Sequence, residues 1–170
     1  MSPAPPRRII PNPPSGWASW DALMEPALEQ AHLAASLEEV PVGAVVVAAN
    51  GTIIGRGHNQ PVTLADPSAH AEILALRQAG ATMGNYRLAG CVLVVTLEPC
   101  LMCTGAAVHA RLNGIVFGAH DARAGAVCSC LDALALPFHN TEVWQLGGIA
   151  ENTCAALLQH FFLNRRPAQL

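Results

Sequence analysis

Four side chains that could do chemistry lie in two short segments. His70 and Glu72 belong to "DPSAHAEILALR", and Cys100 and Cys103 belong to "TLEPCLMCTG". Imidazole and thiolate are preferred zinc ligands, and a carboxylate can carry a proton during catalysis. A Cys-x-x-Cys pair alone is ambiguous, since it also occurs in redox pairs and as two packed thiols. The position of each segment in the fold must therefore decide its chemistry.

Both segments are predicted to open a helix directly after a sheet-side segment. A spacing of three places the two sulfurs on one helix face, and the helix N-terminus favours the thiolate form that binds metal. His70 occupies the same place on the preceding helix. Two helix N-termini that point at one spot would offer one imidazole and two thiolates, which is the ligand count of a catalytic zinc site with an open fourth position.

His70 and Glu72 stand two residues apart, and residues two apart on a helix do not face each other. We therefore expect different tasks for them. His70 reaches past the helix end as a ligand, whereas Glu72 flanks the water at the metal and exchanges protons as the catalytic acid and base. The plain alternative for Glu72 is an exposed first-turn glutamate that the helix dipole favours.

The elements that must position these residues alternate between apolar strands and amphipathic helices. This alternation predicts an α/β fold, a three-layer α-β-α sandwich with a mixed five-stranded sheet. Helices are expected over 19–40 with Ser19 as N-cap, 69–80 ending at Gly80, 99–112 with Pro99 in first position, and 151–166; strands are expected in a hairpin over 42–59 around Asn50-Gly51, and over 91–97, 113–119 and 141–147. Cys154, Leu157, Leu158, Phe161 and Phe162 are expected to form the apolar face of the last helix.

Composition indicates one domain in a chain of 170 residues. Six of the first 14 residues are Pro, so residues 1–16 are expected to form a flexible arm, followed by a single domain over 17–166 and a short tail over 167–170. No apolar run approaches the length of about 18 residues that a membrane span needs. The N-terminus does not resemble a secretory signal, which favours the cytoplasm, where cysteines are thiols or metal ligands rather than disulfides.

A net charge of −3 argues against a protein that coats nucleic acid through a broad basic surface. It is compatible with an enzyme that reads a few splayed RNA bases in pockets. All nine basic residues are Arg, which suits phosphate and base contacts, although a GC-rich genome would produce the same bias.

The order H-x-E followed by P-C-x-x-C is a recognised signature of zinc nucleobase deaminases. Beyond it, the chain resembles the bacterial tRNA-specific adenosine deaminases of the TadA type, in the cytidine and deoxycytidylate deaminase superfamily, over roughly residues 18–166. The segments that carry the resemblance are "EVPVGAVVV", "DPSAHAEILALRQAG", "NYRL", "TLEPCLMCTGAAVHAR", "VFGAHDARAGA" and "CAALLQHFF".

This resemblance implies a cytidine-deaminase-like fold and a homodimer with active sites near its interface. It also implies one Zn²⁺ per subunit on His70, Cys100 and Cys103, with Glu72 as the catalytic residue. The implied substrate is the tRNA anticodon stem-loop, where the wobble adenosine becomes inosine.

The resemblance further implies substrate contacts by Asn59, Ala71, Asp121 and Arg123. A turn residue before Pro61 is the alternative for Asn59, and a loop-capping carboxylate is the alternative for Asp121. Arg165 and Arg166 resemble the RNA-facing end of the last helix, but helix C-termini attract cations in any protein.

The remaining histidines and cysteines lack the spacing of metal ligands. His58 is expected beside Asn59, and Cys91 and Cys154 are expected in the core. Cys128 and Cys130 replace small residues of the family and are interpreted as buried thiols, with a second metal site as the alternative. No metal is assigned to His32, His109, His120, His139 or His160.

Two other functions compete with the hypothesis of a tRNA adenosine deaminase. A deaminase of a free nucleobase or nucleoside, such as guanine or cytosine deaminase, would share the fold and all four site residues. A non-catalytic zinc module would use the same ligands to staple the fold, but three ligands beside a glutamate argue against it.

Overall fold

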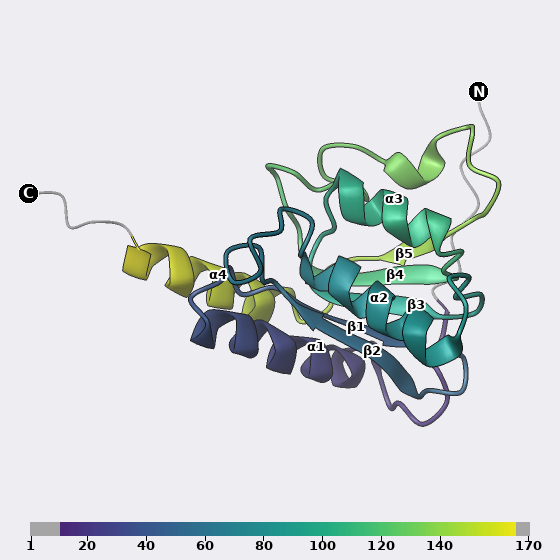
Figure 1. Ribbon diagram of the computed structural model, residues 1–170, viewed down its shortest axis with the longest axis horizontal. Coiled ribbons are helices and arrows are strands. Elements are labelled where there is room, and N and C mark those ends of the chain that lie inside the picture. The colour runs from purple at the N-terminus through teal and green to yellow at the C-terminus, as the bar shows by residue number, and fades with distance from the viewer. Residues whose placement is uncertain (1–10, 166–170) are drawn as a thin grey trace, which may run out of the picture.

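The computed structural model describes residues 11–165, which form a five-stranded sheet covered by helices on both faces (Figure 1). The elements in chain order are α1 (Trp20–Ser36), β1 (Gly43–Val47), β2 (Ile53–His58), α2 (Ala71–Met83), β3 (Val92–Leu97), α3 (Leu101–His109), β4 (Gly114–Ala119), the 3-10 turn η1 (Ala133–Ala135), β5 (Trp144–Leu146) and α4 (Glu151–Arg165). Among these residues, no helix combines the length and the apolar character needed to cross a bilayer.

The direction of the strands determines where the functional segments meet. The strand order is β2-β1-β3-β4-β5; β1 is antiparallel to both of its neighbours, and β3, β4 and β5 are mutually parallel. Consequently β2, β3, β4 and β5 all run the same way, and their carboxyl ends share one edge of the sheet. The segments that follow β2, β3 and β4 therefore start at the same edge of the sheet, and they contain Asn59, Cys100 and Asp121 respectively.

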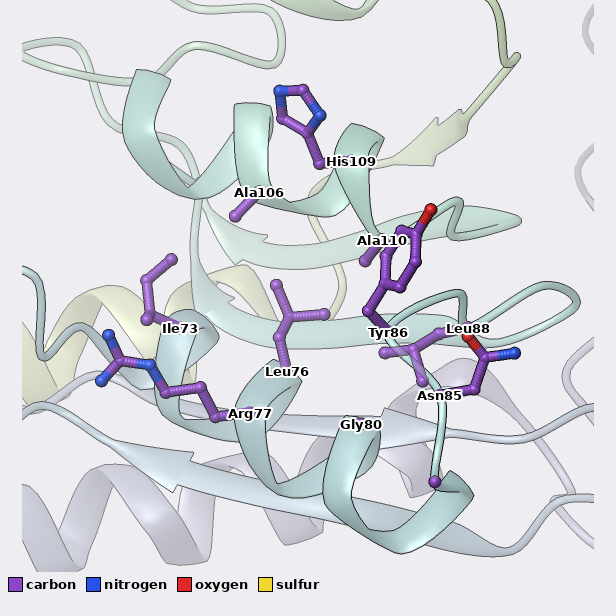
Figure 2. A pocket seen from close by; sticks show the side chains of 11 residues that line it. Ile73, Leu76, Arg77, Gly80, Asn85, Tyr86, Leu88, Ala106, His109 and Ala110 are labelled. Atoms are coloured by element: carbon purple, nitrogen blue, oxygen red, sulfur yellow. The ribbon is translucent and has the colours of Figure 1, made fainter.

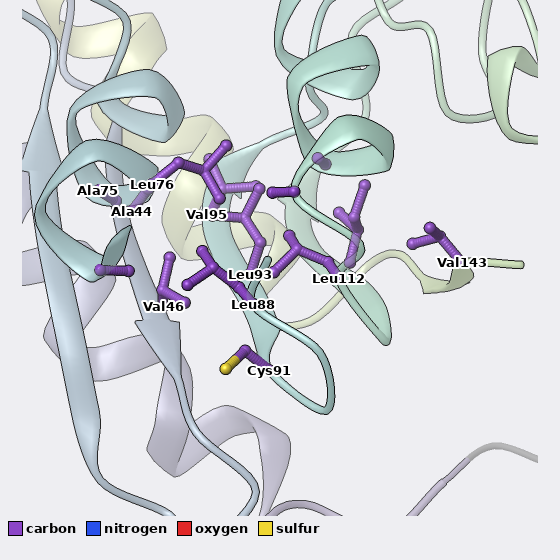
Figure 3. Packing of buried hydrophobic residues seen from close by; sticks show 14 of the residues in the cluster. Ala44, Val46, Ala75, Leu76, Leu88, Cys91, Leu93, Val95, Leu112 and Val143 are labelled. Carbon is purple, nitrogen blue, oxygen red and sulfur yellow. The ribbon is translucent and has the colours of Figure 1, made fainter. Parts of the chain in front are cut away.

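The two faces of the sheet have separate apolar cores. Helices α2 and α3 cover one face, and α1 and α4 cover the other (Figure 1). Figure 3 shows part of the first core, where Val46 of β1 and Leu93 and Val95 of β3 pack near Leu76 of α2. The second core joins buried residues of α1 to β1, β3 and β4. The predicted three-layer sandwich with a mixed five-stranded sheet is confirmed.

The structure confirms two local signals of the sequence. The Ser19 hydroxyl accepts a hydrogen bond of 3.0 Å from the amide of Ala22 and caps α1. The hairpin between β1 and β2 turns at Asn50-Gly51, where Gly51 has a φ of 85°, a conformation that Gly adopts without steric cost.

The predicted ends of three helices were wrong. Helix α1 ends at Ser36 rather than near residue 40. Helix α2 continues through Gly80 to Met83, because Gly84 adopts the left-handed conformation (φ 61°) that ends a helix. Helix α3 begins at Leu101 with Cys100 as its N-cap, so Pro99 precedes the helix instead of opening it.

The predicted apolar face of α4 was also wrong in part. Cys154 is buried, but Phe162 is 51% exposed. The reason is visible in Figure 1, where the C-terminal half of α4 runs past the end of the sheet and has no strand to cover. Residues 1–10 of the expected arm, Arg166 and the expected tail lie outside the described residues.

Small residues allow α2 to lie unusually close to β2. Gly55 and Gly57 of β2 face α2, and a Cβ atom at either position would overlap a backbone carbonyl of the helix, that of Ala75 or Ala71 respectively. Ala71, Ala75 and Ala79 are fully buried against this strand. The contact at Gly57 therefore sets the position of the first turn of α2, which begins directly after His70.

We expect Gly57→Ala to lower the free energy of unfolding by about 1–3 kcal/mol, because the helix must move to accommodate the methyl group. Gly80→Ala is the matched control: its Cβ would lie 3.6 Å from the nearest atom, the Asn85 carbonyl oxygen, and alanine favours a helix by about 0.5–1 kcal/mol. Denaturant unfolding of both variants measures the difference. Equal stability of Gly57→Ala and the parent protein would contradict the close-contact argument.

Candidate metal and catalytic site

His70 and Cys100 occupy equivalent positions, since each is the N-cap of its helix and neither side chain caps the helix. Both side chains instead turn to a common point that Cys103, on the first turn of α3, also faces. His70 Nδ1 lies 3.7 Å from Cys100 Sγ and 3.6 Å from Cys103 Sγ. Among the described residues, these three form the one group whose donor atoms lie close enough to hold a metal ion.

The three donor atoms fit tetrahedral zinc. Zn–S bonds of about 2.3 Å and a Zn–N bond of about 2.05 Å at a tetrahedral angle place sulfur and nitrogen about 3.6 Å apart. The observed distances of 3.6 and 3.7 Å match this value. Three protein ligands leave the fourth corner of the tetrahedron for a water or a substrate atom.

The protein environment already favours a thiolate at the site. A hydrogen bond from the Cys103 thiol, assisted by His70, lowers the pKa of Cys100 to about 4. The same hydrogen bond and burial raise the pKa of Cys103 far above its usual value. The two thiols therefore share a proton through this hydrogen bond, and a metal that binds both as thiolates must displace it.

Glu72 is only 4% exposed and lies in the first turn of α2. This burial excludes the alternative of an exposed first-turn glutamate. Burial raises the pKa of Glu72 to about 7, and a divalent cation beside it would lower that pKa again. A buried carboxyl in this range can both accept and release a proton.

Asn59 holds the helix that presents His70. Its Oδ1 accepts a hydrogen bond of 2.9 Å from the amide of Ala71, so Asn59 supplies the cap that the His70 side chain does not. The Asn59 Nδ2 group donates no hydrogen bond to the other described residues. Ala71 itself is fully buried and its amide is used in this contact.

Asp121 stabilises its own loop. Its Oδ1 accepts hydrogen bonds from the amides of Arg123 at 2.9 Å and Ala124 at 3.3 Å, which is the loop-capping arrangement considered from the sequence. Arg123 is exposed. The contacts of Asn59, Ala71, Asp121 and Arg123 with a substrate remain predictions.

The sequence analysis did not predict that two carboxylates, those of Glu39 and Glu98, would be buried. Glu39 accepts hydrogen bonds from the amide and the hydroxyl of Thr63 at 2.7 and 2.9 Å. Glu98 lies two residues before Cys100, is 2% exposed and accepts several hydrogen bonds from residues 121–129. The available signal for Glu98 was its position, because an acidic residue at the end of an apolar strand must find partners there.

Other expectations have mixed outcomes. Cys91 and Cys154 are buried, as expected, but Cys128 and Cys130 are exposed rather than buried, since their loop lies on the surface. His58 is half-buried and its Nδ1 lies 3.2 Å from Gln30. The guanidinium of Arg165 lies over the Phe161 ring and donates to the Glu38 carbonyl.

Comparisons with known proteins agree with this geometry. The model of the cytidine and deoxycytidylate deaminase zinc-binding region matches residues 18–119. The tRNA-specific adenosine deaminase of Haemophilus influenzae is 42% identical over 146 residues, which cover 86% of this chain and 84% of that protein. The tRNA(Ile)-lysidine synthase of Deinococcus radiodurans is 46% identical over 149 residues, but this chain spans only 25% of its length.

Solved structures share the fold. One, from a study of A-to-I editing by tRNA:A34 deaminases at the wobble position, has a TM-score of 0.77 and 41% identity, and the match covers 79% of this chain and 97% of that one. The guanine deaminase of Nitrosomonas europaea has a TM-score of 0.73 but 26% identity, with 88% of each chain covered. The chain therefore belongs to the cytidine and deoxycytidylate deaminase family and, within it, to the tRNA-specific adenosine deaminases.

Proposed function

We propose that the protein is a zinc-dependent hydrolase that converts adenosine to inosine at the wobble position of the tRNA anticodon. The observation that carries the proposal is the group of His70, Cys100 and Cys103 beside the buried Glu72. Identity above 40% to a tRNA-specific adenosine deaminase over most of both chains supports the choice of substrate.

The protein's own residues account for orientation and proton transfer. Bound zinc would supply a water whose pKa is lowered toward about 7. Glu72 accepts a proton from the water and delivers it to N1 of adenine, which makes C6 more electrophilic, and the oxygen of the water adds to C6. Glu72 then moves the second proton of the water to the amino group, so the C6–N bond breaks, ammonia leaves and C6 becomes a carbonyl.

The residues that follow the strands would hold the nucleotide. The Asn59 Nδ2 group donates no hydrogen bond to residues 11–165, and its N–H groups suit an acceptor atom on a purine edge. Asp121 Oδ2, which has no hydrogen-bond partner in the part of the chain that the structure describes, suits a ribose 2′-hydroxyl, which distinguishes RNA from DNA. Exposed Arg123 suits a phosphate. Ala71 has a buried side chain and an amide bound to Asn59, so it would adjoin the base only through the remaining backbone at the start of α2.

We also propose a homodimer that meets through the face of α2 and α3. A groove of about 740 Å³ lies between these helices, where Ile73 and Leu76 face Ala106 and Ala110 (Figure 2). Leu101, next to the ligand Cys100, is 57% exposed in the single chain. A partner subunit on this face would remove this apolar side chain from water. We further propose that the protein acts in the cytoplasm, because its proposed substrate is a tRNA.

Deamination of a free nucleobase is the competing function, because the guanine deaminase of Nitrosomonas europaea shares the fold. Fold alone does not decide between substrates. The higher identity to the tRNA-specific relative favours RNA.

Removal of one ligand should remove the metal. We expect Cys103→Ser to reduce zinc from one ion per chain to well below half, because a neutral hydroxyl is a poor replacement for thiolate. Cys130→Ser is the matched control, since Cys130 is exposed and lies outside the ligand group, and it should retain the full ion. Metal analysis after gel filtration measures both. Full zinc in Cys103→Ser would contradict the assigned ligand set.

Glu72→Gln should retain zinc but lower turnover by at least about a hundredfold, because an amide cannot carry the proton. The assay uses zinc-loaded protein with a tRNA that bears adenosine at the wobble position, and sequencing reads inosine as guanosine. Free adenosine, guanine and cytosine are tested in parallel. Turnover of a free base without conversion of the tRNA would refute the proposed substrate, and an active Glu72→Gln would remove Glu72 from its role.

A charge in the groove should separate the dimer. Ala106 lines the groove, so Ala106→Arg is expected to elute as a monomer in gel filtration with light scattering, because the buried guanidinium would lack a partner. Ala81→Arg, on the exposed side of α2, should remain a dimer. A dimeric Ala106→Arg would place the interface elsewhere.

A further inference from the structure

Glu98 is a buried carboxylate for which the mechanism above has no task. It follows β3 directly, and only 2% of it is exposed. Within residues 11–165, the ion pairs join other residues, namely Arg77 with Asp66 and His120 with Glu151. A buried carboxylate without a cation is costly unless hydrogen bonds satisfy its oxygens.

One loop supplies all of the hydrogen bonds that Glu98 receives from residues distant in the chain. Its Oε1 accepts from the amides of Val127 at 3.2 Å, Cys128 at 2.8 Å and Ser129 at 2.9 Å. Its Oε2 accepts from the amide of Asp121 at 3.1 Å and from the Ser129 hydroxyl.

The loop is shaped to fit this carboxylate. A Cβ atom at Gly125 would overlap the Glu98 carboxyl group, so a residue without a side chain is needed where the loop crosses it. A second bond, of 2.9 Å from the Ala126 amide to the Pro99 carbonyl, fastens the loop to the turn that ends in Cys100. The same loop carries the exposed Arg123 and also Asp121, whose Oδ1 is used within the loop and whose Oδ2 makes no hydrogen bond to the described residues.

We propose that Glu98 is a positioning residue that clamps the loop of residues 121–129 to the Cys100 turn, and so keeps Asp121 and Arg123 in register with the metal site for RNA binding. The inference rests on the proposed function, because it assigns the loop to the RNA substrate. Glu98 does not touch the reacting atoms. Its loss should therefore affect substrate binding more than the chemical step.

The test compares Glu98→Gln with the parent protein on an RNA anticodon stem-loop that bears adenosine at the wobble position. In the variant, an NH₂ group would face backbone donors in place of an oxygen. We expect KM to rise about tenfold to a hundredfold, in line with the loss of charge-assisted hydrogen bonds, with kcat within about threefold and one zinc per chain retained. Ser129→Ala removes one donor and should raise KM less. Asp132→Asn alters a carboxylate that caps the neighbouring 3-10 turn, outside the clamp, and should leave KM unchanged.

Amide hydrogen exchange provides a readout that does not depend on the substrate. Exchange at Val127, Cys128 and Ser129 should accelerate in Glu98→Gln and, to a smaller extent, in Ser129→Ala. Unchanged KM with unchanged exchange would overturn the proposal, as would loss of zinc or a fall in kcat alone. If the parent protein does not convert the RNA, the proposed function fails, and the exchange rates still decide whether Glu98 clamps the loop. If Glu98→Gln does not fold, Ser129→Ala carries the same test.

Discussion

The convergence of two helix N-termini is the constraint on which the site depends. Strand β1 runs antiparallel between β2 and β3, so both of these strands deliver their chains to the same edge of the sheet. Each chain then enters a helix on the same face, and His70 and Cys100 occupy the two N-caps. The dipoles of α2 and α3 thus aim positive potential at the point where thiolate charge collects.

Using N-caps as metal ligands leaves the helices without their usual side-chain caps, and neighbouring residues take over. Asn59 caps α2 through the Ala71 amide, and Gly57 lets that first turn lie against β2. On the other side, Glu98 joins the Cys100 turn to residues 121–129. Hydrogen bonds between neighbouring side chains and the backbone therefore hold the segments that carry the ligands. The ligand side chains need not cap their helices and can face the metal site.

The sequence predicted the layers, the sheet and the grouping of His70 with the two cysteines, because strand periodicity and ligand spacing are local signals. It failed where the outcome depends on tertiary contacts. Gly80 resembled a helix end, but the left-handed conformation that ends α2 occurs at Gly84. Phe162 has the spacing of a core residue, yet the sheet does not extend beneath it. The partners of Glu98 lie 23 to 31 residues away in the chain, where no spacing rule reaches.

The two parts of the long connection between β4 and β5 differ in how they are held to the rest of the fold. The first part, up to Ser129, is tied to Glu98 through the backbone, so adding or deleting a residue there would move amides away from the carboxylate. The later part, which includes the exposed Phe138, makes no hydrogen bond to Glu98 among the described residues. The Ala133 amide still donates to the Ala126 carbonyl, so changes in chain length should be tolerated between residue 135 and β5 and rejected before residue 135, which gives insertions and deletions in homologous chains a definite place to accumulate.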